Sequence, residues 1–194
     1  MEKMRRSGLM LVTVFVLALS TAWAHAGARS NTTCPVNYIT GIQWDDEFGY
    51  GASELTRCLE RRHNLKVVVQ INQLYNTGST TQSYGIGNIN NILNDYEITH
   101  GLQDRDYELV VVIHGAGGPM VLNNNALEPN EIVNPFQSQI EALISKGVKV
   151  YICHNTARNL NLKVPQLIPG VGFVPSGVSA IIDFQKLGYV YLQP

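Results

Sequence analysis

The chain has 194 residues, of which 45% are hydrophobic and 15% charged, and its formal net charge at pH 7 is −1. This length suits a single domain whose hydrophobic core is large enough for folding without disulfides or bound metal ions. The balanced charge and the lack of a Lys/Arg-rich segment exclude a surface built to neutralise phosphates, so we expect no nucleic-acid partner.

The N-terminus has the pattern of a secretory signal peptide. Lys3, Arg5 and Arg6 precede an apolar run from Leu9 to Leu19, and small residues follow around Ala24. We therefore predict that residues 1–24 are removed, that the protein is periplasmic or secreted, and that no stable membrane insertion remains after cleavage. An uncleaved membrane anchor is the alternative, but the run is shorter than the roughly 18 residues of a typical span.

Three cysteines, Cys34, Cys58 and Cys153, belong to an oxidising compartment if the chain is exported. Cys34 and Cys58 both lie in residues 25–65, a polar N-terminal segment in which Ser53 predicts the start of a short helix. The economical pairing is a disulfide between these two, although sequence alone does not fix the connectivity. Cys153 would then be a free thiol, and its plain interpretation is a small buried hydrophobic residue.

From residue 66 onward, short apolar runs alternate with helical patterns. Continuous β-branched runs are typical of strands buried on both faces. By this criterion we predict strands at Lys66–Ile71, Tyr107–Ile113, Val148–Cys153, Val171–Val174 and Tyr189–Leu192.

Helical periodicity fills the gaps between these runs. The first helix has apolar side chains on one face, at Ile86, Ile89, Leu93 and Tyr96. The second is predicted over 134–146 with Gly147 as terminator, and the third over 176–187, with Ser176 as N-cap, Ile181 and Ile182 facing inward and Gly188 as terminator. The alternation predicts an α/β domain over 66–194, with a five-stranded, largely parallel, doubly wound sheet covered by helices on both faces.

Ligands bind at the carboxyl ends of the strands in such a sheet, so the loops after the strands hold the candidate site. The second strand is followed by His114-Gly115-Ala116-Gly117-Gly118-Pro119. Its glycines allow close backbone approach and can present amides to an anion, which makes Gly115, Gly117 and Gly118 candidate ligand-binding residues. An ordinary turn is the alternative. The spacing is not a dinucleotide-binding fingerprint, and we expect no cofactor.

The third strand is followed by Cys153-His154-Asn155-Thr156-Ala157-Arg158. A thiolate is the reactive form of cysteine, and a nearby imidazole, guanidinium or helix N-terminus lowers the pKa of a thiol. His114, at the end of the neighbouring strand, and Arg158, if the segment turns helical, are the candidate catalytic partners of Cys153. His154 would point to the opposite face if the strand continued.

Two further residues, Asn155 and Ser176, complete the candidate ligand-binding set. We predict no metal site, because His114, Cys153 and His154 do not have the spacing of a known metal-binding motif.

Three segments resemble the DsrE/DsrF-like family: Val110 to Gly115, the stretch Val148-Lys149-Val150-Tyr151-Ile152-Cys153-His154-Asn155-Thr156, and the closing segment from Leu167 through Val178 to Tyr189. The resemblance spans about residues 66–194 and leaves residues 27–65 outside. It implies a five-stranded α/β fold, assembly into oligomers, and a sulfur relay in which a cysteine at the position of Cys153 holds a persulfide. Export and the extra N-terminal segment with Cys34 and Cys58 depart from the family pattern.

Two functions follow from these observations. The first is a sulfurtransferase or sulfur carrier that forms a persulfide on Cys153, with a sulfane-sulfur species or a sulfur-carrier protein as its partner. The second is a non-catalytic, oligomeric binding or scaffold module of the same fold, since a fold does not dictate a function. In both cases we expect a homo-oligomer. An exposed, activated Cys153 would favour the first function, and an inert Cys153 would favour the second.

Overall fold

A computed structural model of the chain describes residues 38–39, 42–56, 64–75, 78, 82–126 and 133–194. The predicted signal peptide at 1–24 and the predicted pair of Cys34 and Cys58 lie outside the described residues. The polar N-terminal segment contains two short paired strands, β1 (Tyr38–Ile39) and β2 (Ile42–Gln43), followed by the helices α1 (Trp44–Phe48) and α2 (Ala52–Leu55). The carboxylate of Asp45 in α1 accepts hydrogen bonds from the amide and the hydroxyl of Ser53 in α2, at 2.8 and 3.0 Å.

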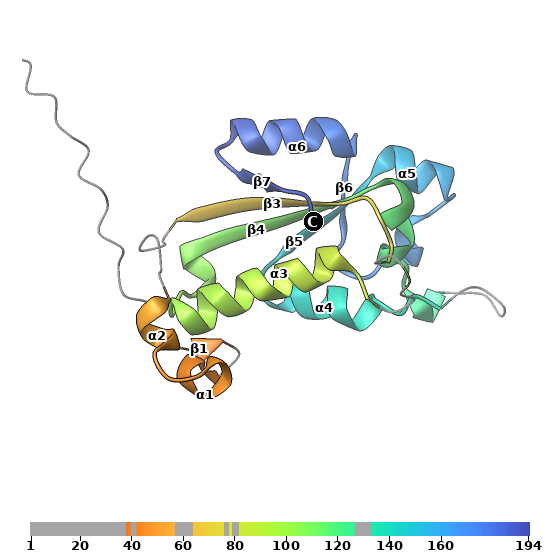
Figure 1. Cartoon of the computed structure of the whole chain (residues 1–194). Helices are drawn as coiled ribbons and strands as arrows, with labels where there is room; N and C mark the ends of the chain where they lie inside the picture. Colours follow the sequence, from red (N-terminus) through yellow and green to blue (C-terminus); the bar gives the residue numbers. More distant parts are fainter. Residues whose placement is uncertain (1–37, 40–41, 57–63, 76–77, 79–81, 127–132) are drawn as a thin grey trace, which may run out of the picture. The chain divides into compact units, whose positions relative to one another are not determined.

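The main sheet has five parallel strands, as predicted (Figure 1). They are β3 (Leu65–Ile71), β4 (Tyr107–Ile113), β5 (Lys149–Cys153), β6 (Gly172–Val174) and β7 (Val190–Leu192), and their spatial order is β6-β5-β4-β3-β7. Each strand begins within one residue of its predicted start and ends where predicted. The register pairs Ile71 with Ile113 and Ile113 with Ile152, so these strands reach the carboxyl edge together.

Helices cover both faces of the sheet, which confirms the predicted architecture. One face is covered by α6 (Gly177–Lys186), and the other by α3 (Tyr84–Asn94) and α4 (Gln137–Ser145), as Figure 1 shows. α3 continues into a π-helical turn, η1 (Asp95–Thr99), and a short helix, α5 (His154–Asn159), follows β5 directly. Four 3₁₀ segments complete the described elements: η2 (Asp104–Asp106), η3 (Gly115–Val121), η4 (Asn124–Ala126) and η5 (Val164–Gln166).

The strand alternation divides the core into two layers. In β4, Leu109, Val111 and Ile113 pack under α3 and α4, whereas Val110 and Val112 pack under α6. This explains why the strand sequences are continuously apolar, because both faces of the central strands are buried. The predicted inner face of α3 and η1 is correct, since Ile86, Ile89, Leu93 and Tyr96 are all buried.

Two details of the predicted helices are wrong. The second predicted helix starts at Gln137 rather than at residue 134, because the side chain of Asn134 binds the carbonyls of Met120 and Leu122 at 2.7 and 2.9 Å. Pro135 also disfavours helical geometry at the residue before it. In α6, Ile182 is 49% exposed, because the buried face of this helix is formed by Ala180 and Ile181. Among the described helices, none has both the length and the apolar character to cross a membrane.

Candidate functional site

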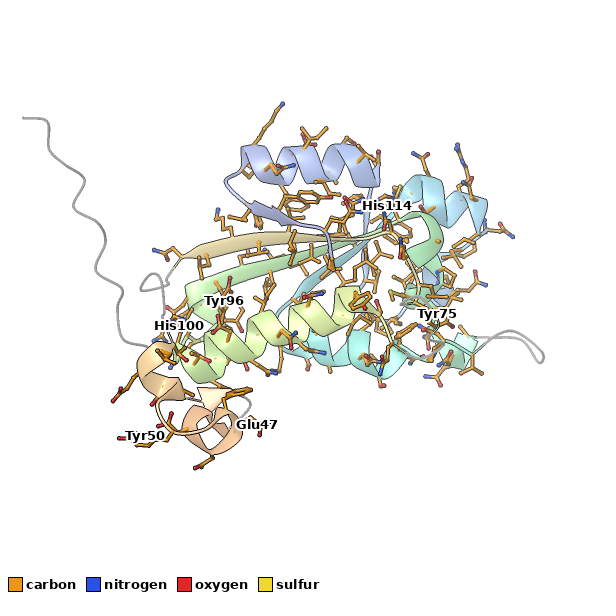
Figure 2. All side chains as sticks on the ribbon, in the orientation of Figure 1. Glu47, Tyr50, Tyr75, Tyr96, His100 and His114 are labelled. Atoms are coloured by element: carbon orange, nitrogen blue, oxygen red, sulfur yellow. The ribbon has the colours of Figure 1, made fainter. Side chains whose placement is uncertain are left out.

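The candidate site lies at the carboxyl edge of the sheet, on the face that α6 covers. Side chains that alternate along β3, β4 and β5 place Gln70, His114 and Cys153 on this face, because each lies an even number of residues from a side chain packed in that layer. The register that pairs Ile113 with Ile152 sets His114 beside Cys153. Figure 2 shows His114 at the end of the sheet where α5 and α6 begin. The predicted adjacency of these two strand ends is therefore present.

Cys153 is a free thiol with only 5% of its surface exposed. Burial raises the pKa of this thiol, but hydrogen bonds from the backbone amides of Thr156 and Gly177 lower it. The amide of Asn155 and the hydroxyl of Thr156 lower it further, so that the net pKa lies below the ordinary value of 9.0. Because α5 and α6 both begin beside the sulfur, their first amides point at it and stabilise the thiolate. This set of donors is called the thiolate cradle below.

Thr156 joins the glycine-rich segment to the thiol. Its Oγ1 accepts a hydrogen bond of 2.9 Å from the amide of Gly115, while its hydroxyl bonds Cys153. A hydroxyl has one hydrogen to donate, so the Gly115 amide leaves that hydrogen for the sulfur. Gly115 has a φ of +57°, in the left-handed region that glycine adopts without strain. The glycine at this turn thus allows an amide to orient Thr156.

The other two glycines predicted to bind ligand are buried against the chain itself. A Cβ atom on Gly117 would lie 3.0 Å from the carbonyl oxygen of Ile71, and one on Gly118 would lie 2.5 Å from Leu160 and 2.7 Å from Thr156. Both positions therefore require a residue without a side chain for packing. Gly115 is the exposed glycine of the three, and a ligand could reach its surface. A role of Gly117 and Gly118 in ligand binding stays a prediction.

His114 packs on Gly177, whose amide bonds the thiol. Its ring is packed so closely on Gly177 that an added Cβ there would be 2.9 Å from His114 Cγ. The ring Nε2 lies 2.7 Å from Nε2 of Gln70 in β3. Burial lowers the pKa of His114 below its ordinary value, which favours the neutral imidazole. His114 therefore contacts the thiolate cradle without supplying a positive charge to it.

The remaining predicted residues lie around the start of α5 and α6. Arg158 is exposed, with its Nη2 3.5 Å from Oδ1 of Asn155. Neither Arg158 nor His114 is among the described groups that shift the pKa of Cys153. Ser176 occupies the N-cap position of α6, as predicted, but its side chain makes no capping hydrogen bond. The catalytic role of Arg158 and the ligand-binding roles of Asn155 and Ser176 stay predictions.

His154 occupies a place that strand geometry alone does not predict. The chain turns helical directly after Cys153, so the expected alternation of side chains stops there. The imidazole instead stacks on Phe173 of β6, with ring centres 4.5 Å apart and an interplanar angle of 10°. His154 is thus held on the outer strand by an aromatic contact.

Residues that sequence analysis did not assign to the site supply most of its polar contacts. Thr156 and Gly177 donate to the thiol, and Gln70 contacts His114. Every residue except proline has a backbone amide, so the residue type does not reveal which amide binds a ligand. For this reason the contact from Gly177 was not predicted. Gln70 did leave a signal, because it is the one amide side chain in the apolar run from residue 67 to 71.

A separate cavity of about 410 Å³ lies between loops at the same edge of the sheet. Its walls are mainly apolar, from Leu74, Tyr75, Pro119, Leu122, Val133, Pro135, Leu160 and Leu162, with polar atoms from Asn134 and Gln166. Neither Cys153 nor His114 lines it. Within the described parts of the chain, no three His, Cys, Asp or Glu side chains are grouped so as to hold a metal ion.

Comparison with one solved structure supports the fold. A protein of unknown function, MTH1491 from Methanobacterium thermoautotrophicum, is 23% identical, with a TM-score of 0.54 over 68% of this chain and 100% of that chain. The ychN protein from E. coli is 16% identical, with a TM-score of 0.42 over 67% of this chain and 100% of that chain. No curated protein matches.

The family comparison covers the sheet and the candidate site together. The model of the DsrE/DsrF-like family matches residues 65–194, which include the five parallel strands and Cys153. Since this match takes in most of the chain, the protein belongs to the DsrE/DsrF-like family.

Proposed function

We propose that this protein handles sulfur, accepting a sulfane sulfur atom on Cys153 and delivering it to another thiol. The observation that supports this function is the thiolate cradle, in which amides from the starts of α5 and α6 lower the pKa of an otherwise buried thiol. Membership of the DsrE/DsrF-like family suggests a role related to sulfur relay. A buried structural cysteine needs no such set of donors, because it stays protonated.

The chemistry needs only the thiolate and a donor with a weak sulfur–sulfur bond. With thiosulfate, the sulfur of Cys153 attacks the outer sulfur and forms a new sulfur–sulfur bond. The old bond breaks, its electron pair leaves with sulfite, and Cys153 becomes a persulfide anion. The amides of Thr156 and Gly177 that bond the thiolate would then face the anionic product. Attack of an acceptor thiolate on the terminal sulfur returns Cys153 to the thiolate.

The depth of Cys153 limits which donors can react directly. With 5% of the residue exposed, a small inorganic anion needs less opening of the site than a peptide or a bulky reagent does. Transfer to a protein acceptor would require local movement near the start of α6, where Gly177 packs on His114 and its amide bonds the thiol. We accordingly assign small sulfane-sulfur species as donors and a sulfur-carrier protein as acceptor.

The setting of this function is proposed from the sequence. We propose that export places the mature chain in the periplasm or outside the cell, because residues 1–24 have the pattern of a signal peptide. We also propose a homo-oligomer, on the basis of the family resemblance. Size-exclusion chromatography with light scattering tests the assembly, and a stable monomer would contradict it.

Intact-mass analysis after exposure to thiosulfate or polysulfide tests the sulfur function. The expected result is added sulfur on the wild type and on a variant in which both Cys34 and Cys58 are replaced by Ser, and none at this site in Cys153→Ser. The double variant is the matched control, because Cys153 is its only cysteine. Absence of an adduct on the double variant, with its folding shown by circular dichroism, would refute the proposal.

The burial of Cys153 also favours a second function, that of a non-catalytic oligomeric binding or scaffold module. A thiol with 5% exposure is well placed as a packing residue. The two functions differ in alkylation of the folded protein. A Cys153 that resists even small alkylating reagents, together with no sulfur adduct, would support the module.

A further inference from the structure

The apolar cavity beside the thiol site is built from four separate segments of the chain. They are residues 74–75 after β3, 119–122 around the end of η3, 133–135 before α4 and 160–166 after α5. These segments lie far apart in the sequence and converge on a space of about 410 Å³. Small-molecule sites in proteins are concave, mainly apolar spaces of about 300–1,000 Å³. In size and lining, the cavity therefore resembles a ligand site rather than a flat apolar patch.

Hydrogen bonds between these segments hold the walls of the cavity in place. The side-chain nitrogen of Asn134 donates to the carbonyl oxygens of Met120 and Leu122, at 2.7 and 2.9 Å. The amide of Asn123 donates to the carbonyl oxygen of Gln166 at 2.8 Å, which joins the segment after η3 to the segment after α5. Walls that are fixed in this way keep the cavity open without a ligand. A preformed site lowers the free-energy cost of binding, because little has to be ordered when the ligand enters.

The chemistry of the walls determines the charge of a suitable ligand. Among the described residues that line the cavity there is no Asp, Glu, Lys, Arg or His. A charged group placed against these walls would lose hydration without gaining an ion-pair partner. The side chain of Asn134 is already used for the bonds between loops, so Tyr75 and Gln166 are the lining side chains that can bond a polar atom of a ligand. The walls therefore suit a ligand with few polar atoms and no charge.

We propose that this cavity binds an uncharged, mainly apolar small molecule with two or three rings, or with an alkyl group of similar volume. The size follows from the space available. An engineered cavity of about 150 Å³ in another protein holds one benzene molecule. The space of about 410 Å³ thus corresponds to two or three such rings. The site is distinct from the proposed sulfur chemistry, because neither Cys153 nor His114 lines the cavity.

Fluorescence titration of the full chain with N-phenyl-1-naphthylamine tests the site, because this neutral probe with three rings becomes brighter when it leaves water. The expected result is saturable binding that depends on the cavity. Leu162→Trp puts a larger side chain in the wall and should weaken this binding by about tenfold or more. Val133→Trp makes the same change at a lining position that is 65% exposed, where the larger side chain leaves the core intact.

Two control variants separate the cavity from other places where the probe can bind. Val164→Trp is the matched control, because Val164 is 70% exposed, lies in the same segment as Leu162 and does not line the cavity. It should bind the probe as the wild type does. Cys153→Ser should also bind as the wild type does, since the thiol is not part of the walls. Failure of the sulfur function would therefore leave the result for the cavity unchanged.

Several outcomes would overturn the inference: a wild type without saturable binding, a loss in Val164→Trp equal to that in Leu162→Trp, or a loss in Cys153→Ser. If circular dichroism shows that Leu162→Trp does not fold, Val133→Trp decides alone. Light scattering of the same proteins tests the other occupant, a second copy of the chain. An assembly that dissociates in Val133→Trp would assign the cavity to a subunit interface and would also overturn the inference. Lost probe binding with an unchanged assembly would support it.

Discussion

Replacement of Gly177 by alanine tests whether the contact between α6 and His114 is as tight as the geometry indicates. The new Cβ would lie 2.9, 3.0 and 3.0 Å from Cγ, Cβ and Cδ2 of His114. Because His114 Cβ is itself too close, rotation of the ring cannot relieve the contact, and the backbone must shift. Overpacking of this kind costs about 1–3 kcal/mol. The gain from alanine over glycine in a helix, about 0.5–1 kcal/mol, offsets part of that.

The expected net loss of stability is up to about 2.5 kcal/mol, which lowers the midpoint of urea unfolding by up to about 1 M. The matched control is Gly87→Ala in α3, where the new Cβ meets nothing within 4 Å. That variant should gain about 0.5–1 kcal/mol. In Gly177→Ala the shift of α6 should also move its first amide from the sulfur and raise the Cys153 pKa, which slows alkylation at neutral pH. Equal unfolding midpoints for the two variants would refute the close contact.

Three further predictions concern the thiol and the core. Thr156→Val should raise the Cys153 pKa and slow the alkylation of Cys153 at neutral pH. Thr156→Ser keeps the hydroxyl and should be alkylated at the wild-type rate. Equal alkylation rates in the two variants would contradict the bridge from Gly115 through Thr156. Because the folded-state pKa of Cys153 is depressed, the stability advantage of wild type over Cys153→Ser should be complete above pH 9.0 and decline as the pH falls through the folded pKa. Urea unfolding under reducing conditions measures this difference, and a flat profile would show a thiol that is neutral in the fold. Phe136→Ala, at a fully buried position, should lower the free energy of unfolding by about 3–5 kcal/mol in the same assay. A loss below about 1 kcal/mol would mean that neighbouring side chains fill the cavity left by the phenyl ring.

The fold could be predicted from sequence because its signals are local. The sequences of buried parallel strands are continuous runs rich in β-branched residues, so β4 was predicted over its full length. Helix ends were visible in Gly147 and Gly188, whose φ angles of +81° and +88° favour glycine. The start of α4 was mispredicted because Asn134 is used for hydrogen bonds to a distant loop, and apolar periodicity does not record such a tertiary contact.

The candidate site was only partly predictable. Cys153 and His114 could be placed together, because parallel strands in register end side by side. The partners of the thiol could not be predicted from side chains, because three of the four hydrogen bonds to it come from backbone amides. Sequence analysis therefore named two side chains, His114 and Arg158, as partners of the thiol, whereas amides at two helix starts make the contacts. The amide of Gly177 depends on how α6 returns across the sheet, which is a property of the whole fold.

The use of amides rather than a cation has a consequence for the medium in which the protein works. Attraction between separated charges is screened by dissolved ions over about 8 Å at physiological ionic strength. A buried hydrogen bond acts at contact distance, where no ion can enter between donor and sulfur. The acidity of Cys153 should therefore change little between dilute and concentrated salt. In the proposed location outside the cytoplasm, where the cell does not regulate salt, such a thiol would keep the same reactivity as the surroundings change.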